Sequence, residues 1–235
     1  MQRAPHIDFM IRFLPIILAI VYGYAMFRFS VWRTARELDE KSTELADPIL
    51  KVLMDRMATA LEIDRIRVHI YEIPQVNGLA APDGRIFITR GFFNKYRAGQ
   101  VTSEEMASVI AHELGHVALG HSRRRMIDFS AQNAMRTALA MIFNRFLPGI
   151  GPWIATGLIS LIAARLSRDD EFEADAYASA LLVKAGIGTG PQKSMFTKLE
   201  KLTGAHGAAT PAWMLSHPKT PQRIAAIEAN EAKWL

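Results

Sequence analysis

The residues His112 to His116 read H-E-L-G-H, which matches the zinc-binding pattern H-E-x-x-H. On a helix, residues four positions apart share a face, so His112 and His116 could direct two imidazoles at one metal ion. Glu113 follows His112 and could touch a metal-bound water without binding the metal itself. The pattern therefore predicts one zinc ion per chain, with Glu113 as the base that activates its water.

This chemistry requires a helix, and the neighbouring residues predict one. Thr102 and Glu105 have the spacing of a capping box at a helix start. Apolar residues then recur at helical spacing, and Gly120 is suited to end the helix. Glu113 falls within the mostly apolar stripe, where a carboxylate is costly unless it is paired or near a metal. The plainer alternative is a helix that happens to carry two histidines.

A hydrolytic zinc site normally has three protein ligands and an open position for water. The chain contains no cysteine, so the third ligand must be His, Asp or Glu. The strongest candidate lies in the segment 167–175, which reads S-R-D-D-E-F-E-A-D. There Glu171 and Asp175 are four residues apart and share a helix face, whereas Glu173 does not. Taken alone, the segment could also be a solvated acidic helix start.

The composition excludes several classes of protein. The 235 residues are 50% hydrophobic and 22% charged, which is typical of neither a disordered nor a fibrous chain. The net charge of +5 suggests an anionic partner. Arginines flank the apolar runs, so we expect that partner to be membrane lipid. No nucleic acid is expected, because aromatic residues are not interleaved with the basic cluster Arg123–Arg125.

An uncharged run from Phe13 to Phe27 predicts a membrane anchor. A helix of that length spans about 22 Å, less than a hydrocarbon core of roughly 30 Å. Extending it over Phe9–Trp32, with Arg12 and Arg28 reaching outward, closes the gap. We expect residues 1–32 to hold the chain in a bacterial inner membrane by this single helix. A signal peptide and an interfacial helix are the alternatives, and the side of the membrane stays open.

The remaining chain predicts an α+β, mostly helical protein. Residues 33–61 suggest a charged amphipathic helix within a linker segment, 33–65. Strands are predicted over 67–73 and 85–90, so that a small sheet would lie beside the zinc helix. The apolar region 137–164 is interrupted by prolines and glycines, and its second helix is short for a membrane span. We expect this region to be a helical hairpin in the core, with a membrane or re-entrant segment as the alternative.

Four blocks of sequence occur in a characteristic order over the region from Ile66 to Leu235. They are Val76–Ala80 with Gly84–Gly91, His112–His116 with His121 after it, Ser167–Asp175, and His217-Pro218 with Arg223-Ile224. In this combination the sequence resembles the HtpX-like, CAAX prenyl endopeptidase-like gluzincin zinc metallopeptidases. The resemblance implies a gluzincin-type metallopeptidase domain over residues 66–235.

The resemblance also implies roles for individual residues near the zinc. Glu171 would be the third zinc ligand, and Asp175 would orient a ligand histidine. His217 and Arg223 look like the pair that borders the substrate carbonyl and stabilises the oxyanion. His217 could instead be a turn residue before a proline, and Arg223 could simply pair with an acid.

Two further positions bear on the resemblance. Asn77 looks like the family asparagine beside the edge strand that holds extended substrate. Gly78 stands where the family usually has a small alanine, so the local strand geometry can differ. A metzincin would need a third histidine where Ser122 stands, which excludes that class. His121 is expected to be structural, near a helix end and facing away from the zinc.

Together these features predict a membrane-anchored zinc endopeptidase that acts on polypeptides, in particular misfolded or membrane-associated proteins. The alternative from another class is a membrane-bound chaperone or scaffold with a structural zinc. The presence of Glu113 speaks against it, because a closed structural site needs no base. A prenylated-peptide endopeptidase is a third possibility, but it would require more transmembrane helices than this sequence offers.

Overall fold

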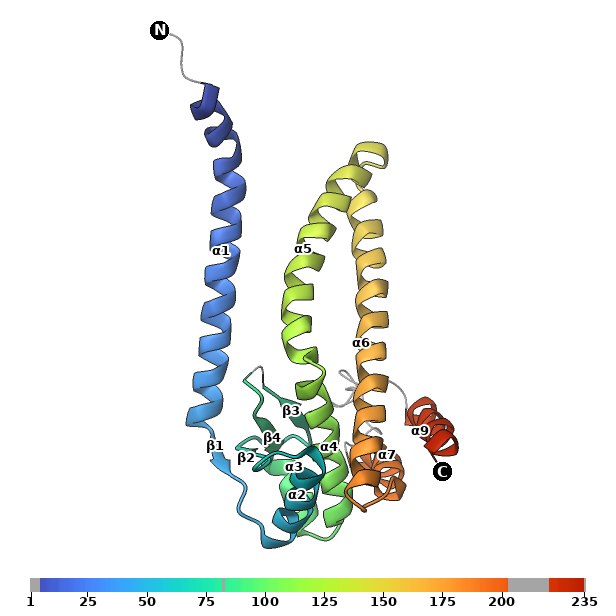
Figure 1. The fold of residues 1–235 in the computed structure, drawn as a ribbon. Helices are drawn as coiled ribbons and strands as arrows, with labels where there is room; N and C mark the ends of the chain where they lie inside the picture. Colours follow the sequence, from blue (N-terminus) through green and yellow to red (C-terminus); the bar gives the residue numbers. More distant parts are fainter. Residues whose placement is uncertain (1–4, 82, 203–219, 235) are drawn as a thin grey trace. The chain divides into compact units, whose positions relative to one another are not determined.

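The computed structural model describes residues 5–81, 83–202 and 220–234 (Figure 1). The chain divides into two compact units, Met1–Lys41 and Ser42–Leu235. The first unit is one long helix, α1 (Pro5–Glu40), on which Val21, Tyr22 and Trp32 are exposed. Of the helices as described, none is both long and apolar enough to span a bilayer. The side chains of residues 1–20, which include much of the expected anchor, lie outside the described residues.

The helix expected over residues 33–61 is interrupted. After α1 ends, the strand β1 (Ser42–Glu44) intervenes, and a new helix α2 (Pro48–Leu61) begins. Asp47 caps α2 by accepting hydrogen bonds from two backbone amides, and Pro48 occupies the first turn. A residue before proline is disfavoured in helical conformation, which explains the break. The buried apolar face of α2 belongs to the core of the second unit, Ser42–Leu235.

A four-stranded sheet carries one side of the domain. Its order is β1-β2-β4-β3, with β2 (Val68–Tyr71) parallel to β4 (Ile86–Thr89). The short β3 (Gly78–Ala80) pairs antiparallel with β4 and is the outer strand within the described part of the chain. The two predicted strands are thus present, β3 lies where the resemblance implied an edge strand beside Asn77, and β1 was not predicted.

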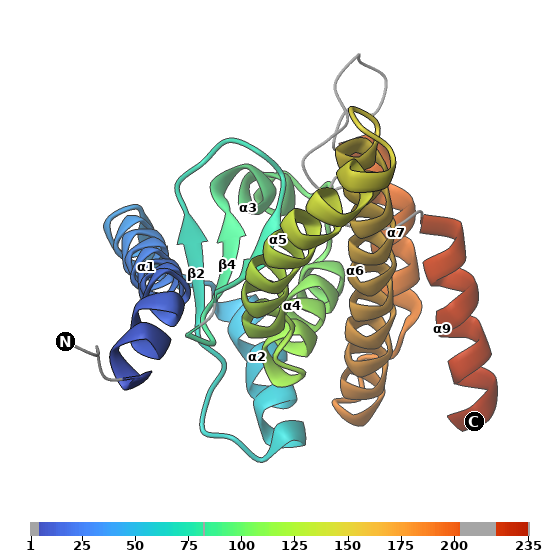
Figure 2. The same cartoon turned by 90° about the horizontal axis from the view of Figure 1, so that it is seen from above.

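The helices that follow pack against this sheet and against each other. Figure 2 shows α4 between the sheet and α6, with α7 and α9 beyond α6. Apolar side chains of α4, β4 and α6 meet in one core, which includes Met106, Ile110, Ile88 and Leu182. The bounds of these helices are α3 Arg90–Arg97, α4 Ser103–Ala118, α5 His121–Phe146, α6 Gly151–Lys184, α7 Gly190–Leu202 and α9 Thr220–Trp234.

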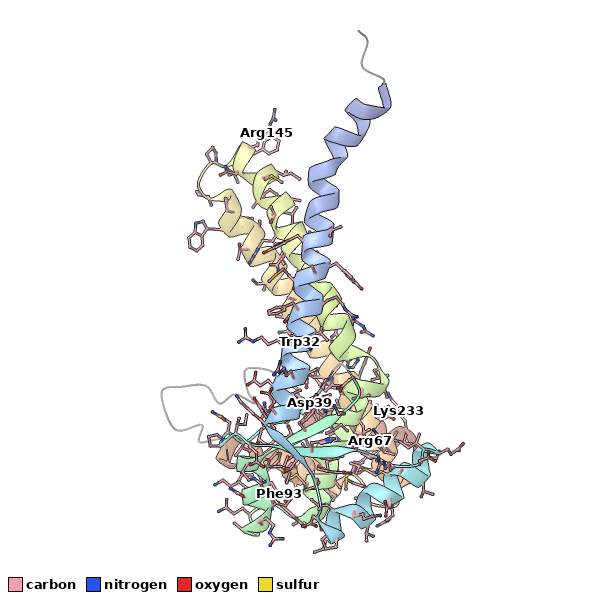
Figure 3. The ribbon with its side chains drawn as sticks, turned by 90° about the vertical axis from the view of Figure 1, so that its left-hand side faces the viewer. Trp32, Asp39, Arg67, Phe93, Arg145 and Lys233 are labelled. Atoms are coloured by element: carbon pink, nitrogen blue, oxygen red, sulfur yellow. The ribbon has the colours of Figure 1, made fainter. Side chains whose placement is uncertain are left out.

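The helical hairpin formed by α5 and α6 extends away from the core, with Arg145 near its tip (Figure 3). The expectation of a core hairpin over residues 137–164 is therefore wrong. Trp153 and Leu161 are 79% and 71% exposed. Over residues 146–164 the buried positions are Gly151, Ala155 and Ile159. These lie four residues apart on one face of α6, which packs on α5 and leaves the other faces uncovered.

Candidate metal centre

The predicted zinc helix is present as α4, and its start has the predicted capping box. Thr102 accepts from the Glu105 amide over 3.2 Å, and Glu105 accepts from the Thr102 amide over 2.9 Å. Gly115 lies between the two motif histidines, where α4 crosses α6. A Cβ at Gly115 would come within 2.9 Å of the Ala174 carbonyl oxygen. The glycine therefore permits the close approach that brings the motif next to the acidic segment of α6.

Three side chains from α4 and α6 converge at this crossing. The Nε2 atoms of His112 and His116 are 3.1 Å apart, and they lie 3.3 and 3.4 Å from the two carboxylate oxygens of Glu171. All three side chains are buried. Ligand atoms about 2.05 Å from a tetrahedral zinc ion would be roughly 3.3 Å apart. The donor set and its spacing therefore fit zinc.

The charge of the crossing also suits a divalent cation. Glu113, Glu171 and Asp175 are buried carboxylates, and Arg223 is a buried cation among them. When all are ionised, negative charge exceeds positive charge by two, which is unfavourable in a buried site unless compensated. Burial lowers the pKa of His112, but hydrogen bonds to Asp175 and Glu171 outweigh this and raise the pKa to about 9. The site thus attracts positive charge even as metal-free protein.

A carboxylate binds the Nδ1 side of the His112 ring. Its Nδ1 lies 2.9 Å from Oδ1 of Asp175, one helical turn after Glu171. Arg223 of α9 donates to both carboxylate oxygens of Asp175 over 2.6 Å, and its guanidinium stacks 4.1 Å above the Phe196 ring. Burial alone would raise the pKa of Asp175, but Arg223 lowers it below its usual range. An ionised Asp175 accepts the Nδ1 proton of His112 and leaves Nε2 available for metal.

His116 is held by residues that sequence analysis did not assign to the site. The Nδ1 of His121 lies 2.9 Å from the Nδ1 of His116, and Nε2 of His121 lies 3.1 Å from the Glu173 carboxylate. His121 is fully buried. The expectation that His121 faces away from the zinc is thus wrong. Gly120 adopts a left-handed conformation, with φ of 69°, and turns the chain so that α5 starts beside the site. Gly120 was the signal in the sequence that could have placed His121 beside the site.

The predicted base and substrate residue lie on neighbouring elements. Glu113 is 2% exposed. A Cβ on Gly78 of β3 would lie 3.1 Å from its Oε1 atom. Asn77 directly precedes β3, and its backbone exchanges hydrogen bonds with Thr89 on β4. The structure thus brings Glu113 beside the outer strand, whereas the predicted His217 lies outside the described residues.

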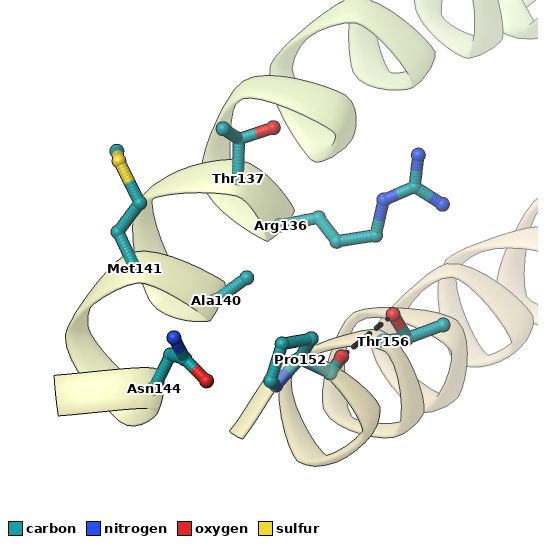
Figure 4. Close-up of a pocket in the computed structure, with 7 residues that line it drawn as sticks. All are labelled: Arg136, Thr137, Ala140, Met141, Asn144, Pro152 and Thr156. Carbon is teal, nitrogen blue, oxygen red and sulfur yellow. Dashed lines mark hydrogen bonds between the residues drawn. The ribbon is translucent and has the colours of Figure 1, made fainter. Parts of the chain in front are cut away.

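A pocket of ≈ 400 Å³ lies elsewhere, between the protruding parts of α5 and α6 (Figure 4). In it the Thr156 hydroxyl donates to the Pro152 carbonyl oxygen. Thr156 precedes Glu171 in α6 by about 22 Å along the helix axis, so the pocket is not part of the metal centre. The remaining residues that line it are Arg136, Thr137, Ala140, Met141 and Asn144.

Comparison with known proteins agrees with this geometry. The family model described as "Peptidase family M48" matches residues 44–231. The chain is 30% identical over 167 residues to the metalloprotease YcaL of Escherichia coli (strain K12), which covers 69% of this chain and 61% of YcaL.

Two other relatives are also named as proteases. The mitochondrial metalloendopeptidase OMA1 of Homo sapiens is 25% identical over 169 residues, covering 68% of this chain and 31% of OMA1. An HtpX protease homologue of Bordetella avium (strain 197N) is 28% identical over 209 residues, covering 74% of this chain and 67% of that protein. The chain thus spans less than two thirds of YcaL and about a third of OMA1.

Proposed function

The chain belongs to peptidase family M48, and with it to the zinc metalloendopeptidases, and from this premise we propose that it cleaves internal peptide bonds of polypeptides. The observation that carries the proposal is the convergence of His112, His116 and Glu171 beside the buried Glu113. Two imidazoles and one carboxylate leave a fourth position for water, as hydrolytic zinc sites require. Misfolded or membrane-associated proteins are the proposed substrates.

In the proposed reaction each residue has a distinct task. Zinc bound by the three ligands would lower the pKa of its water toward 7 and polarise the scissile carbonyl. Glu113 accepts the proton of the attacking water and passes it to the nitrogen of the leaving amine. The contacts of Arg223 support a positioning task for it, because two of its N–H groups hold Asp175, which in turn holds His112. His217 remains the proposed contact to the oxyanion.

The substrate is proposed to bind as an extended strand along β3. In the described part of the chain β3 is the outer strand of the sheet, and an extended peptide can add a strand beside an outer strand through backbone hydrogen bonds. Its first residue, Gly78, lies against Glu113, so a peptide paired with β3 would pass close to the base. Asn77 would contact that peptide at the start of the strand.

We further propose that the chain is attached to a bacterial inner membrane, with residues 1–32 as the anchor. The uncharged run Phe13–Phe27 supports this attachment. The exposed apolar side chains of the α5–α6 hairpin support a second contact with membrane lipid.

The catalytic proposal is tested by replacing Glu113 with Gln. We expect Glu113→Gln to bind one zinc per chain while cleavage of an unfolded casein substrate falls by about 10²–10⁴-fold, because the proton acceptor is lost. Glu104→Gln, at an exposed position of the same helix, should cleave like the parent protein. A Glu113→Gln protein that cleaves at the parent rate would contradict the proposal. A parent protein that binds zinc but cleaves nothing would favour the chaperone or scaffold.

A further inference from the structure

The ring of His116 is connected to a chain of side chains that runs from α4 through α5 to α6, with His116 and His121 buried and Glu173 exposed. Its Nδ1 lies 2.9 Å from the Nδ1 of His121. On the far side of that ring, Nε2 of His121 lies 3.1 Å from Glu173 Oε2 and 3.7 Å from Asp170 Oδ1. His116 and His121 are 5% and 0% exposed, so water is largely kept from both imidazoles.

Two Nδ1 atoms this close can share only one proton. A hydrogen bond needs a donor on one ring and a lone pair on the other, and two N–H groups would repel each other. In a neutral imidazole that binds metal through Nε2, the proton is on Nδ1. His116 must therefore be the donor in this pair if it is a zinc ligand, and His121 must be the acceptor.

The proton of His121 is fixed by the same reasoning. Because its Nδ1 accepts from His116, a neutral His121 carries its proton on Nε2. That nitrogen faces the Glu173 carboxylate, which accepts the proton. Asp170 lies farther from Nε2 and is itself bound by Arg124 over 3.1 Å. Every donor along the line thus meets an acceptor, in one arrangement of protons only.

We propose that His121 is a positioning residue that sets the tautomer and ring orientation of the zinc ligand His116, with Glu173 setting the tautomer of His121. The proposal rests on the proposed function, because it takes His116 as a zinc ligand. Under this proposal, different groups accept the Nδ1 protons of the two ligand histidines. His112 donates to a carboxylate directly, whereas His116 donates to a neutral imidazole.

The same proton count excludes a second metal site at His121, Asp170 and Glu173. Their donor atoms lie within 4.8 Å of one another, a spacing that could hold a second metal ion. A metal ion on Nε2 of His121 would leave the proton of that ring on Nδ1, facing His116. His116 would then have to keep its own proton on Nε2 and would lose its lone pair toward zinc. Neutral histidines therefore hold one zinc ion in this region, not two.

The experiment compares zinc binding by two His121 variants of the full chain, in a Glu113→Gln background that prevents self-cleavage. His121→Leu has similar bulk but no acceptor, and we expect zinc to bind about 10–100-fold more weakly, as measured by competition with a chelator. His121→Asn can place its side-chain oxygen near the former Nδ1 and accept the His116 proton. We expect it to bind zinc more tightly than His121→Leu and close to the Glu113→Gln parent.

Melting temperatures of the metal-free proteins show whether each variant folds. A second measurement needs no His121 variant: ¹⁵N chemical shifts of the zinc-loaded Glu113→Gln protein should show His121 protonated on Nε2 and not on Nδ1. Any one of four results would overturn the proposal. They are zinc binding by His121→Leu as tight as in the parent, an equal loss of zinc affinity in both variants, a proton on Nδ1 of His121, and two zinc ions per chain. Failure of the parent to bind zinc would overturn the proposed function as well, whereas zinc binding without cleavage in the native chain would overturn that function alone.

Discussion

The two halves of α6 differ in the polarity of their side chains and in their surroundings. Its first half is largely apolar, yet Trp153 and Leu161 are 79% and 71% exposed. Its second half carries the acidic segment, yet Glu171 and Asp175 are 0% and 1% exposed. Burial along this helix therefore follows the partners that the rest of the chain supplies, rather than the polarity of the side chains.

The partners differ in a way that explains the contrast. At the second half, α2, α4 and α9 pack against the helix, and α4 and α9 bring histidines and Arg223 to the carboxylates. In the described part of the second unit, α5 is the helix that packs against the first half of α6, and one helix can cover one face. The metal centre thus depends on paired charges inside a core, whereas the hairpin is a two-helix extension whose side chains contribute little to that core.

The largest expected effect comes from removing the buried cation of the metal centre. Arg223→Met leaves Asp175 ionised and buried without its main partner, and we expect a loss of about 3–5 kcal/mol in the unfolding free energy of the metal-free protein. Zinc affinity should also fall, by about 10–100-fold, because Asp175 no longer orients His112 firmly. Urea denaturation and chelator competition measure the two effects.

The matched control removes an arginine from the hairpin. Arg136 is exposed and donates to Asn133 one turn away, so Arg136→Met should change stability by no more than about 0.5 kcal/mol. The double variant Arg223→Met, Asp175→Asn should recover part of the stability lost in Arg223→Met, because the unpaired charge is then removed. Equal losses from Arg223→Met and Arg136→Met would contradict the contrast between the two regions.

A smaller effect is expected from Glu105, a buried carboxylate outside the metal centre. Burial tends to raise its pKa, but hydrogen bonds from Ser194, Lys198 and the Thr102 amide bring the pKa below its usual 4.5. A carboxylate with a lowered folded pKa stabilises above about pH 4.5, and that stabilisation is lost as pH falls through the folded value. We expect Glu105→Gln to cost about 1–2 kcal/mol at pH 7.

The pH dependence of stability separates the electrostatic effect of Glu105→Gln from a simple packing defect. The stability difference between the parent and Glu105→Gln should shrink as pH falls below 4.5, since the parent then loses the same charge. Thermal denaturation at several pH values measures it. Asp55→Asn, which removes an exposed carboxylate paired with Lys51 on α2, should show almost no difference at any pH. A constant loss for Glu105→Gln across the pH range would refute the electrostatic explanation.

The sequence predicts the two ends of α6 with unequal success. The capping box, the H-E-x-x-H helix and the spacing of Glu171 and Asp175 are local patterns, and their helices and their convergence are present in the structure. The contacts of His121 depend on how Gly120 redirects the chain, which spacing along one helix does not reveal. The exposure of the hairpin depends on which elements reach it, whereas the expected shortness of its second helix favoured the core over a membrane span.

The smallest expected effect on the folded domain comes from the hairpin surface. Trp153→Gln and Leu161→Gln together should change the unfolding free energy by no more than about 0.5 kcal/mol and leave zinc affinity unaltered, because both side chains are exposed. Ile159→Gln provides the control on the same helix, since Ile159 is 6% exposed and faces α5, and it should destabilise the hairpin measurably.

The same variants test the proposed contact with lipid. Sedimentation with anionic phospholipid vesicles should recover less of the Trp153→Gln, Leu161→Gln protein than of the parent, because apolar area is lost from the surface proposed to enter the bilayer. An equal recovery of both proteins would show that the hairpin does not contribute to membrane binding. A large drop in stability would instead show that these side chains are covered by protein, which would remove the contrast between the two ends of α6.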